Sequence, residues 1–246
     1  MKILVCVSKA PDTTSKIAFK DGNSSFDEAG VQFIVNPYDE WYALVRAIEL
    51  KETNGGSVTT ITVGGADHDP IIRKALAIGA DSAVRVDKDP EDSFDTAAEI
   101  ANYAKAENFD LIICGKETIN HNGAIVGGMV AELLDLPYVS LATKLEMTGS
   151  EALISREAGA GIEVVAVNGP VVVSAAKGMA EQRIPNMRGI MAARSKPLTV
   201  IPGSNSESLT SIGQYTLPEE KGDCKYIDAE NPEELIRLLN EEAKVL

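Results

Sequence analysis

Three short apolar runs each lead directly into a small or polar loop that opens a helix-like segment. The runs are Ile3–Val7, Val58–Val63 and Leu111–Cys114, and helical patterns recur between them. Asn36-Pro37 predicts the cap and the start of the first helix. A later helix is expected over roughly residues 123–134, followed by a strand at 138–141, and residues 21–23 predict a hairpin-like turn. Strands separated by helices of this length predict parallel strand–helix–strand units with right-handed crossovers. We therefore expect an α/β fold, a doubly wound and mostly parallel sheet with helices on both faces.

The loops that follow these runs predict a ligand-binding crevice. In an open parallel sheet, ligands bind where the carboxyl ends of neighbouring strands meet. The loops are residues 8–12, 64–67 and 115–118, and they are rich in small residues that let a ligand approach the backbone. Helix N-termini offer unpaired N–H donors to an anion, so a nucleotide is the predicted ligand. None of the loops carries a GxGxxG or Walker fingerprint, and each alone is also typical of a tight strand-to-helix turn.

The second half of the chain departs from the alternating pattern. Residues 144–147, 152–156 and 162–167 predict a small antiparallel insertion, and Pro170–Ser174 predicts a buried strand. From Gly203 the chain is polar and aperiodic until Asn231-Pro232 opens a final helix. We expect a nucleotide-binding domain over residues 1–202 and a C-terminal arm over residues 203–246, which either packs on a partner subunit or is a disordered tether.

Composition excludes several functions. The net charge of −14 argues against nucleic-acid binding, which needs a basic surface. No apolar stretch approaches the length of a membrane span and the N-terminus lacks a secretory signal, so we expect a cytoplasmic protein without membrane insertion. Two histidines without Cys or Glu at ligand spacing predict no metal site, and no catalytic constellation is recognisable. Cys6 and Cys114 lie within apolar runs, where buried and inert thiols are expected.

One segment carries the opposite charge. Residues 177–196 hold five basic residues against the single acid Glu181, interleaved with Ile and Met. Arg and Met are enriched at protein interfaces, although an amphipathic helix covering the sheet would give the same pattern. Because Pro185-Asn186 interrupts the segment, we expect a protruding loop and a short helix that dock on a partner.

Taken together, these residues resemble the β subunit of an electron transfer flavoprotein. The resemblance covers essentially the whole chain, and its combination of weak motifs is specific. The matching stretches are residues 2–7 with Asp12 and Lys16, Asn36-Pro37-Tyr38 with Glu40, residues 72–81, 111–116 and 134–137, Arg156-Glu157, Ile184-Pro185-Asn186 with Met191 and Ala192, and residues 231–235.

The resemblance implies both cofactors and partners. Members pair with an α subunit that holds most of the FAD, form a heterodimer, and carry electrons from dehydrogenases of the acyl-CoA dehydrogenase type, as in fatty acid β-oxidation, to a quinone oxidoreductase. Their β subunit also buries AMP or, in bifurcating relatives, a second FAD. Carried over by position, the cofactor-binding residues would be Cys6, Asn36, Tyr38, Val63, Gly115, His121, Asn122 and Gly123. The partner-docking residues would be Ile184, Pro185, Met187, Met191 and Glu157.

One departure concerns the nucleotide. In that family, the loop after the position of Lys116 usually carries polar side chains that hold the phosphate of the nucleotide. In this sequence Ile125 and Val126 stand where the family has two of those polar residues. AMP, a second FAD or no nucleotide therefore all stay open. The alternatives to an electron-transfer subunit are an ATP-dependent adenylyl-transfer enzyme and a nucleotide-binding module of the universal-stress kind. The enzyme would need a Lys-bearing phosphate loop and Mg²⁺-binding carboxylates, and neither is recognisable. The universal-stress alternative leaves the insertion, the basic segment and the arm unexplained.

Overall fold

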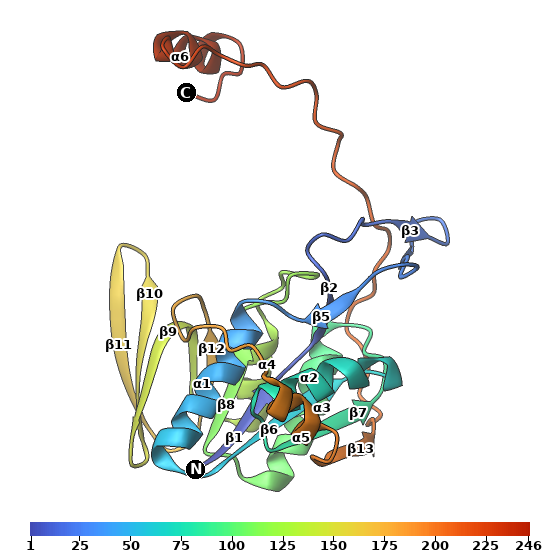
Figure 1. Cartoon of the computed structure of the whole chain (residues 1–246), viewed down its shortest axis with the longest axis vertical. Coiled ribbons are helices and arrows are strands. Elements are labelled where there is room, and N and C mark those ends of the chain that lie inside the picture. The colour runs from blue at the N-terminus through green and yellow to red at the C-terminus, as the bar shows by residue number, and fades with distance from the viewer.

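Nine strands form a single sheet in a computed structural model that describes all residues from Met1 to Leu246 (Figure 1). In spatial order the strands are β11 (Gly161–Asn168), β10 (Glu151–Ala158), β9 (Tyr138–Thr148), β12 (Val171–Ala175), β8 (Leu111–Gly115), β1 (Lys2–Cys6), β6 (Ser57–Val63), β7 (Ser82–Asp87) and β13 (Leu198–Pro202). Every pair from β9 to β13 is parallel, whereas β9, β10 and β11 pair antiparallel. The predicted fold class is confirmed, including the antiparallel insertion.

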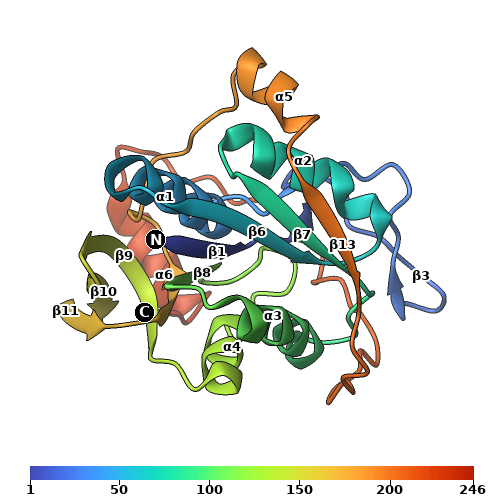
Figure 2. The same ribbon diagram turned by 90° about the horizontal axis from the view of Figure 1, so that it is seen from below.

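Helices cover both faces of the sheet (Figure 2). One face packs against α1 (Asp39–Asn54) and α2 (Asp69–Ile78), with the short α5 (Met187–Ala193) resting on α2. The other face packs against α3 (Ser93–Glu107) and α4 (Val126–Leu134). Each face of the sheet has its own hydrophobic core, and residues of β1 belong to the two cores alternately, because successive side chains of a strand point to opposite faces. Ile3 and Val5 lie under α1, whereas Leu4 and Cys6 lie under α3.

Three boundaries differ from the sequence-based expectation. Helix α1 begins at Asp39 with Tyr38 at the N-cap position, so the prediction that Asn36 caps this helix was wrong; the Asn36 amide is engaged by another loop. Helix α4 begins at Val126 rather than near Gly123, because Asn122 and Ala124 adopt left-handed backbone angles that no helix continues. Strand β9 runs unbroken through two segments that were expected to be separate strands.

Two small ladders lie outside the main sheet. Strand β2 (Lys9–Pro11) pairs antiparallel with β5 (Phe33–Val35), and β3 (Phe19–Lys20) pairs with β4 (Ser25–Phe26). The second ladder confirms the hairpin expected around residues 21–23. A short 3₁₀ helix, η1 (Ala66–His68), precedes α2. No helix in the structure combines the length and apolar character that a bilayer crossing requires.

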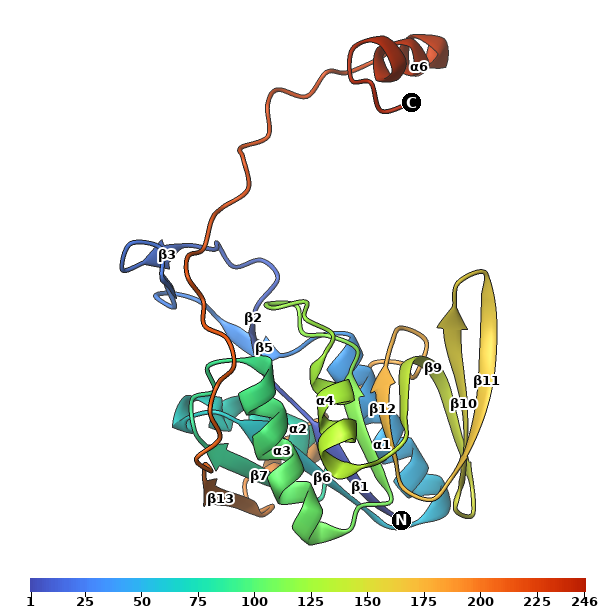
Figure 3. The same ribbon diagram turned by 180° about the vertical axis from the view of Figure 1, so that it is seen from behind.

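The C-terminal arm leaves the body as an extended chain (Figure 3). Residues 203–231 contain no helix or strand, and the arm ends in α6 (Pro232–Glu241). Its first part is held by α3, where Leu209 N–H donates to Asp92 at 2.7 Å, and Tyr215 stacks on Phe19 of β3 at 4.7 Å between ring centroids. Beyond Tyr215 no hydrogen bond links the arm to the body.

Candidate functional site

A cleft opens between the carboxyl ends of β1 and β8. Along the sheet, strand order reverses here, since the chain proceeds from β1 toward β6 on one side and from β8 toward β12 on the other. Such a switch point is where open α/β sheets bind ligands. The cleft is lined by residues of β1, β6 and β8 and of the loops that follow β1 and β8, together with Glu40 of α1, Thr96 and Ile100 of α3 and Val126 at the start of α4.

The structure places the predicted cofactor-binding residues in two groups. Four of them line the cleft: Cys6, Val63, Gly115 and Gly123. The other four do not line it: Asn36, Tyr38, His121 and Asn122. His121 lies on an exposed turn of the loop, although neighbouring protein atoms partly desolvate its imidazole and lower its pKa. Cofactor contact stays a prediction for all eight residues.

The cleft is small and partly apolar. Its cavity volume is about 100 Å³, whereas pockets for small ligands usually measure roughly 300 Å³ or more. Ala124, Ile125 and Val126 form one side, so the start of α4 offers an anion its backbone N–H groups but no polar side chain of its own. With the loop over residues 116–125 as it stands, the cavity is therefore below the usual size range of a ligand pocket.

Two crevice glycines make room for side chains of the chain itself. A Cβ at Gly115 would lie 2.7 Å from Cγ of Glu40, and one at Gly64 would lie 2.5 Å from the His68 ring. Small residues were expected in these loops because they let a ligand approach the backbone. Packing within the chain is a further reason, since a side chain at either glycine would collide with Glu40 or His68.

Glu40 is a buried carboxyl that sequence analysis did not identify as a site residue. It is 5% exposed, lines the cleft, and accepts hydrogen bonds from the Ser8 N–H at 2.7 Å and the Ser8 hydroxyl at 2.9 Å. Burial raises its pKa to about 8 despite these hydrogen bonds. The sequence did contain a signal for this burial. Glu40 is spaced from Leu44 and Ala47, both fully buried, so that the three residues share one side of a helix.

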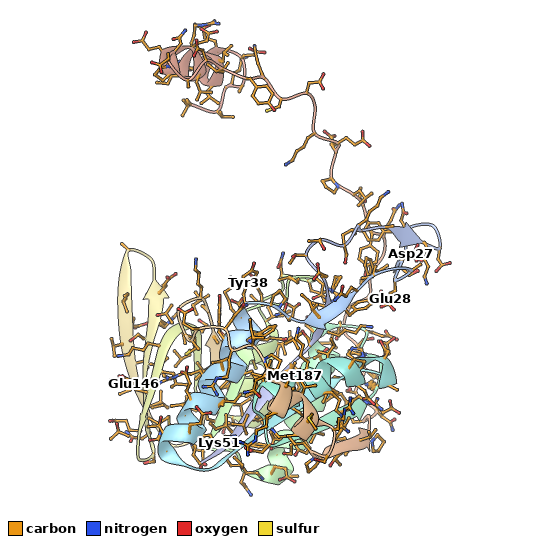
Figure 4. The ribbon with its side chains drawn as sticks, in the orientation of Figure 1. Asp27, Glu28, Tyr38, Lys51, Glu146 and Met187 are labelled. Atoms are coloured by element: carbon orange, nitrogen blue, oxygen red, sulfur yellow. The ribbon has the colours of Figure 1, made fainter.

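Asn36 joins two loops beneath the cleft. Its side chain is completely buried; the amide NH₂ donates to the Glu117 carbonyl at 3.2 Å and the amide oxygen accepts from Ile119 N–H at 3.0 Å. The amide therefore positions the loop after β8. Next to it, Tyr38 adopts φ 64° and ψ −105°, a strained conformation for a bulky residue, and its half-exposed ring lies at the upper edge of the body (Figure 4).

The basic segment, residues 177–196, is fixed at both ends yet presents apolar side chains to solvent. Arg183 donates to both oxygens of Glu52 at 2.8 and 3.0 Å, and its carbonyl accepts from Trp41 Nε1 at 3.3 Å. Arg73 of α2 donates to the carbonyls of Ala193 and Lys196. Between these anchors, the exposed fractions are 83% for Ile184, 72% for Met187 and 67% for Met191, and Pro185 is half-buried.

The predicted docking residue Glu157 lies apart from that segment, near the end of β10. Its exposed carboxylate belongs to an electrostatic group with Lys116 and Glu117, which pair at 2.7 Å. The hydrogen bond to Glu117 raises the pKa of Lys116, and the charge of Glu157 adds to that shift. No group of three or more His, Cys, Asp or Glu side chains is arranged to hold a metal ion.

The fold and the cleft define an open-sheet α/β protein with a cleft at its switch point, an exposed apolar segment and a detached amphipathic helix. The sequence pattern of the family described as "Electron transfer flavoprotein domain" matches residues 24–205. The chain belongs to the electron transfer flavoprotein family. Membership supports an electron-transfer role.

Similar proteins agree with this assignment. Electron transfer flavoprotein subunit beta of Bacillus subtilis (strain 168) is 36% identical, covering 100% of both chains. The subunit of the same name from Syntrophomonas wolfei is 38% identical over 90% of this chain and 87% of its own length. The acryloyl-CoA reductase electron transfer subunit gamma of Anaerotignum propionicum is 31% identical over 82% of this chain and 77% of its own length.

Proposed function

We propose that this chain is the β-type subunit of a heterodimeric flavoprotein that takes electrons from dehydrogenases and passes them to a quinone oxidoreductase. The relatives' names describe subunits of electron-transfer proteins, and the identity to the Bacillus subtilis subunit extends over the whole chain. Donors of the acyl-CoA dehydrogenase type, as in fatty acid β-oxidation, are the proposed dehydrogenases. A cytoplasmic location is part of the proposal.

One observation carries the heterodimer: the arm ends in an amphipathic helix whose apolar side meets nothing in this chain. Leu235 and Ile236 are exposed on α6, and no hydrogen bond connects α6 to the body. An isolated helix of this length is marginal in water without a partner to bury its apolar face. Strand β11 offers a second uncovered surface, because Ile162 and Val164 are exposed at the edge of the sheet. Both surfaces fit an α subunit.

FAD is proposed to lie between the subunits and to be held mostly by the partner. From this chain Tyr38 is the candidate contact, since its exposed ring is maintained at the expense of a strained backbone. When bound, the flavin supplies the electron-accepting and electron-donating chemistry, while the protein supplies position and surroundings. AMP is not proposed as a fixed occupant, because the cleft is small and neither Ile125 nor Val126 offers its phosphate a polar side chain.

The basic segment is proposed to dock transiently on donor proteins. Ile184, Met187 and Met191 form its apolar surface, and Arg188 and Arg194 are exposed beside them without an ion pair. Such a surface suits an acidic partner, because complementary charge speeds encounter while apolar anchors hold the complex. Glu157 is proposed to help keep the partner's flavin-bearing part mobile.

Co-expression with a candidate α subunit tests the proposal. The expected product is a yellow heterodimer, and denaturation should release about one flavin per pair, with the adenine content reporting AMP or a second FAD. Leu235→Asp should prevent association by placing a charge on the apolar side of α6, whereas Glu233→Gln, which changes the charge on the polar side, should not. A chain that stays colourless and alone, or forms an ATP-binding homodimer, would defeat the proposal.

A further inference from the structure

The fold brings two cysteines together that are 108 positions apart in the sequence. The sulfur atoms of Cys6 and Cys114 lie 3.5 Å apart. Val5 pairs with Ile113 across β1 and β8, so the next residue of each strand is this cysteine pair. Both side chains point to the face covered by α3 and α4. The third cysteine, Cys224, is exposed on the arm.

The same two side chains form part of the wall of the cleft at the switch point. They are largely buried, but a molecule in the cleft reaches them without unfolding of the chain. We propose that Cys6 and Cys114 are a reversible dithiol–disulfide pair, oxidised by small peroxides that enter through the cleft. The proposal does not depend on the proposed electron-transfer function.

The backbone geometry already suits a disulfide. Neighbouring strands of a sheet lie about 4.8 Å apart, which is within the Cα separation of roughly 4.4–6.8 Å found in disulfides. The cysteines are on adjacent strands and on the same face. Rotation about the Cα–Cβ bonds therefore brings the sulfurs to bonding distance while the strands keep their register.

The reaction balances with peroxide alone. One sulfur attacks a peroxide oxygen, the O–O bond breaks, and a sulfenic acid and one water form. The second sulfur then displaces the sulfenic oxygen, which leaves as another water with the remaining thiol proton. Two thiols are oxidised to one disulfide, and hydrogen peroxide is reduced to two waters.

Because both thiols are largely buried, we expect peroxide to oxidise them slowly. The hydrogen bond with Cys114 and the loss of solvent raise the pKa of the Cys6 thiol well above its usual range. Because the thiolate is the reactive form, the pair should react more slowly than the exposed Cys224 and faster as pH rises. A disulfide here would join two strand ends that form part of the cleft wall, so the redox state of the pair would alter that wall.

The test uses the full chain carrying Cys224→Ser, so that only the pair remains. After incubation of the folded protein with hydrogen peroxide, we expect both thiols to disappear, the mass to fall by two hydrogens, and a digest without reductant to contain the peptides of Cys6 and Cys114 linked. Dithiothreitol should restore both thiols. Adding Cys6→Ser or Cys114→Ser should abolish the link. Two thiols that persist, or that gain oxygen separately without linking, would overturn the proposal.

Discussion

The Glu40 carboxyl accepts two hydrogen bonds from Ser8, one from the backbone N–H at 2.7 Å and one from the hydroxyl at 2.9 Å. Both bonds reach the same oxygen, and no hydrogen bond within the chain reaches the other. Glu40 thereby joins the start of α1 to the loop after β1, at the edge of the cleft. No cation pairs with it, which is why burial dominates its ionisation.

Glu40 is predicted to make the stability of the protein fall as pH rises. Its pKa is about 8 when folded and 4.5 when exposed, so between these values the unfolded chain ionises while the folded chain holds its proton. The pH-dependent loss is complete above about pH 8, because Glu40 is then ionised in both states. Glu40→Gln keeps an acceptor for Ser8, removes this dependence, and should raise the free energy of unfolding by about 3 kcal/mol at pH 7.

Chemical denaturation of both proteins from pH 5 to 9 measures the difference. Glu132→Gln is the matched control, since Glu132 is exposed on α4 and forms no ion pair. Parallel stability curves for wild type and Glu40→Gln would show that Glu40 is ionised in the folded protein.

Asn36 is predicted to hold the loop after β8 in place. Asn36→Ala leaves the Glu117 carbonyl and the Ile119 N–H without partners, which should lower the free energy of unfolding by about 2–4 kcal/mol. Amide exchange at Ile119 should accelerate more than exchange in β8 itself. Asn54→Ala, at the exposed end of α1, is the control. Unchanged exchange at Ile119 would contradict the role.

Lys88 is predicted to anchor the beginning of the arm. Its ammonium pairs with the buried carboxylates of Asp95 at 2.5 Å and Glu99 at 3.1 Å and donates to the Ser206 hydroxyl at 2.8 Å. Burial alone would raise the pKa of both carboxyls, but hydrogen bonds lower them: Lys88 and Ser206 contribute most for Asp95, and Ser204 contributes most for Glu99.

Lys88→Met should release the arm by leaving two buried negative charges unpaired, at a cost of about 3 kcal/mol. Limited proteolysis should then cut residues 203–215 faster, whereas Lys105→Met, on the exposed side of α3, should leave the cleavage rate unchanged. Because these carboxyls have lowered pKa values when folded, the anchor is fully present above their ordinary pKa and weakens as pH falls through the folded values. Equal cleavage rates for the two variants would refute the anchor.

The sequence predicted the sheet because strand and helix signals are local. The apolar runs at residues 3–7, 58–63 and 111–114 became neighbouring strands β1, β6 and β8 as expected. Asn36 misled the helix prediction, since Asn before Pro is a common cap and only the fold reveals that its amide serves residues 117–119. The sequence also did not predict that Cys6 and Cys114 lie next to each other, because their contact depends on the order of the strands in the sheet.

The site was predicted less completely than the sheet. Glu40 stands in a motif that carries the family resemblance, and its helical spacing from buried residues of α1 was a usable signal of its own burial. The glycines at 64 and 115 predicted space for a ligand, but the space is filled by His68 and Glu40, which no spacing rule anticipates. The structure of the basic segment was predicted more accurately. The loop around Pro185 and the short helix α5 both lie where the charged residues and the proline predicted them.

Ile184 is predicted to be the main apolar anchor for donor dehydrogenases. Its side chain is 83% exposed on a loop that hydrogen bonds of Trp41 and Arg183 tie to α1, and a few anchor side chains carry most of the binding energy of an interface. In the heterodimer, Ile184→Ala should slow flavin reduction by a donor dehydrogenase about tenfold at limiting concentration. Flavin content should be unchanged, because the substitution is distant from the proposed subunit contacts.

Stopped-flow absorbance of the flavin measures the reduction rate across dehydrogenase concentrations. Val200→Ala truncates another exposed β-branched side chain, on β13 and outside the basic segment, and should leave the rate unaltered. The loss should disappear at saturating dehydrogenase, because Ile184 contributes to association and does not touch the reacting atoms. A deficit that persists at saturation would instead place Ile184 in the electron-transfer step, and a rate equal to wild type throughout would remove it from the docking surface.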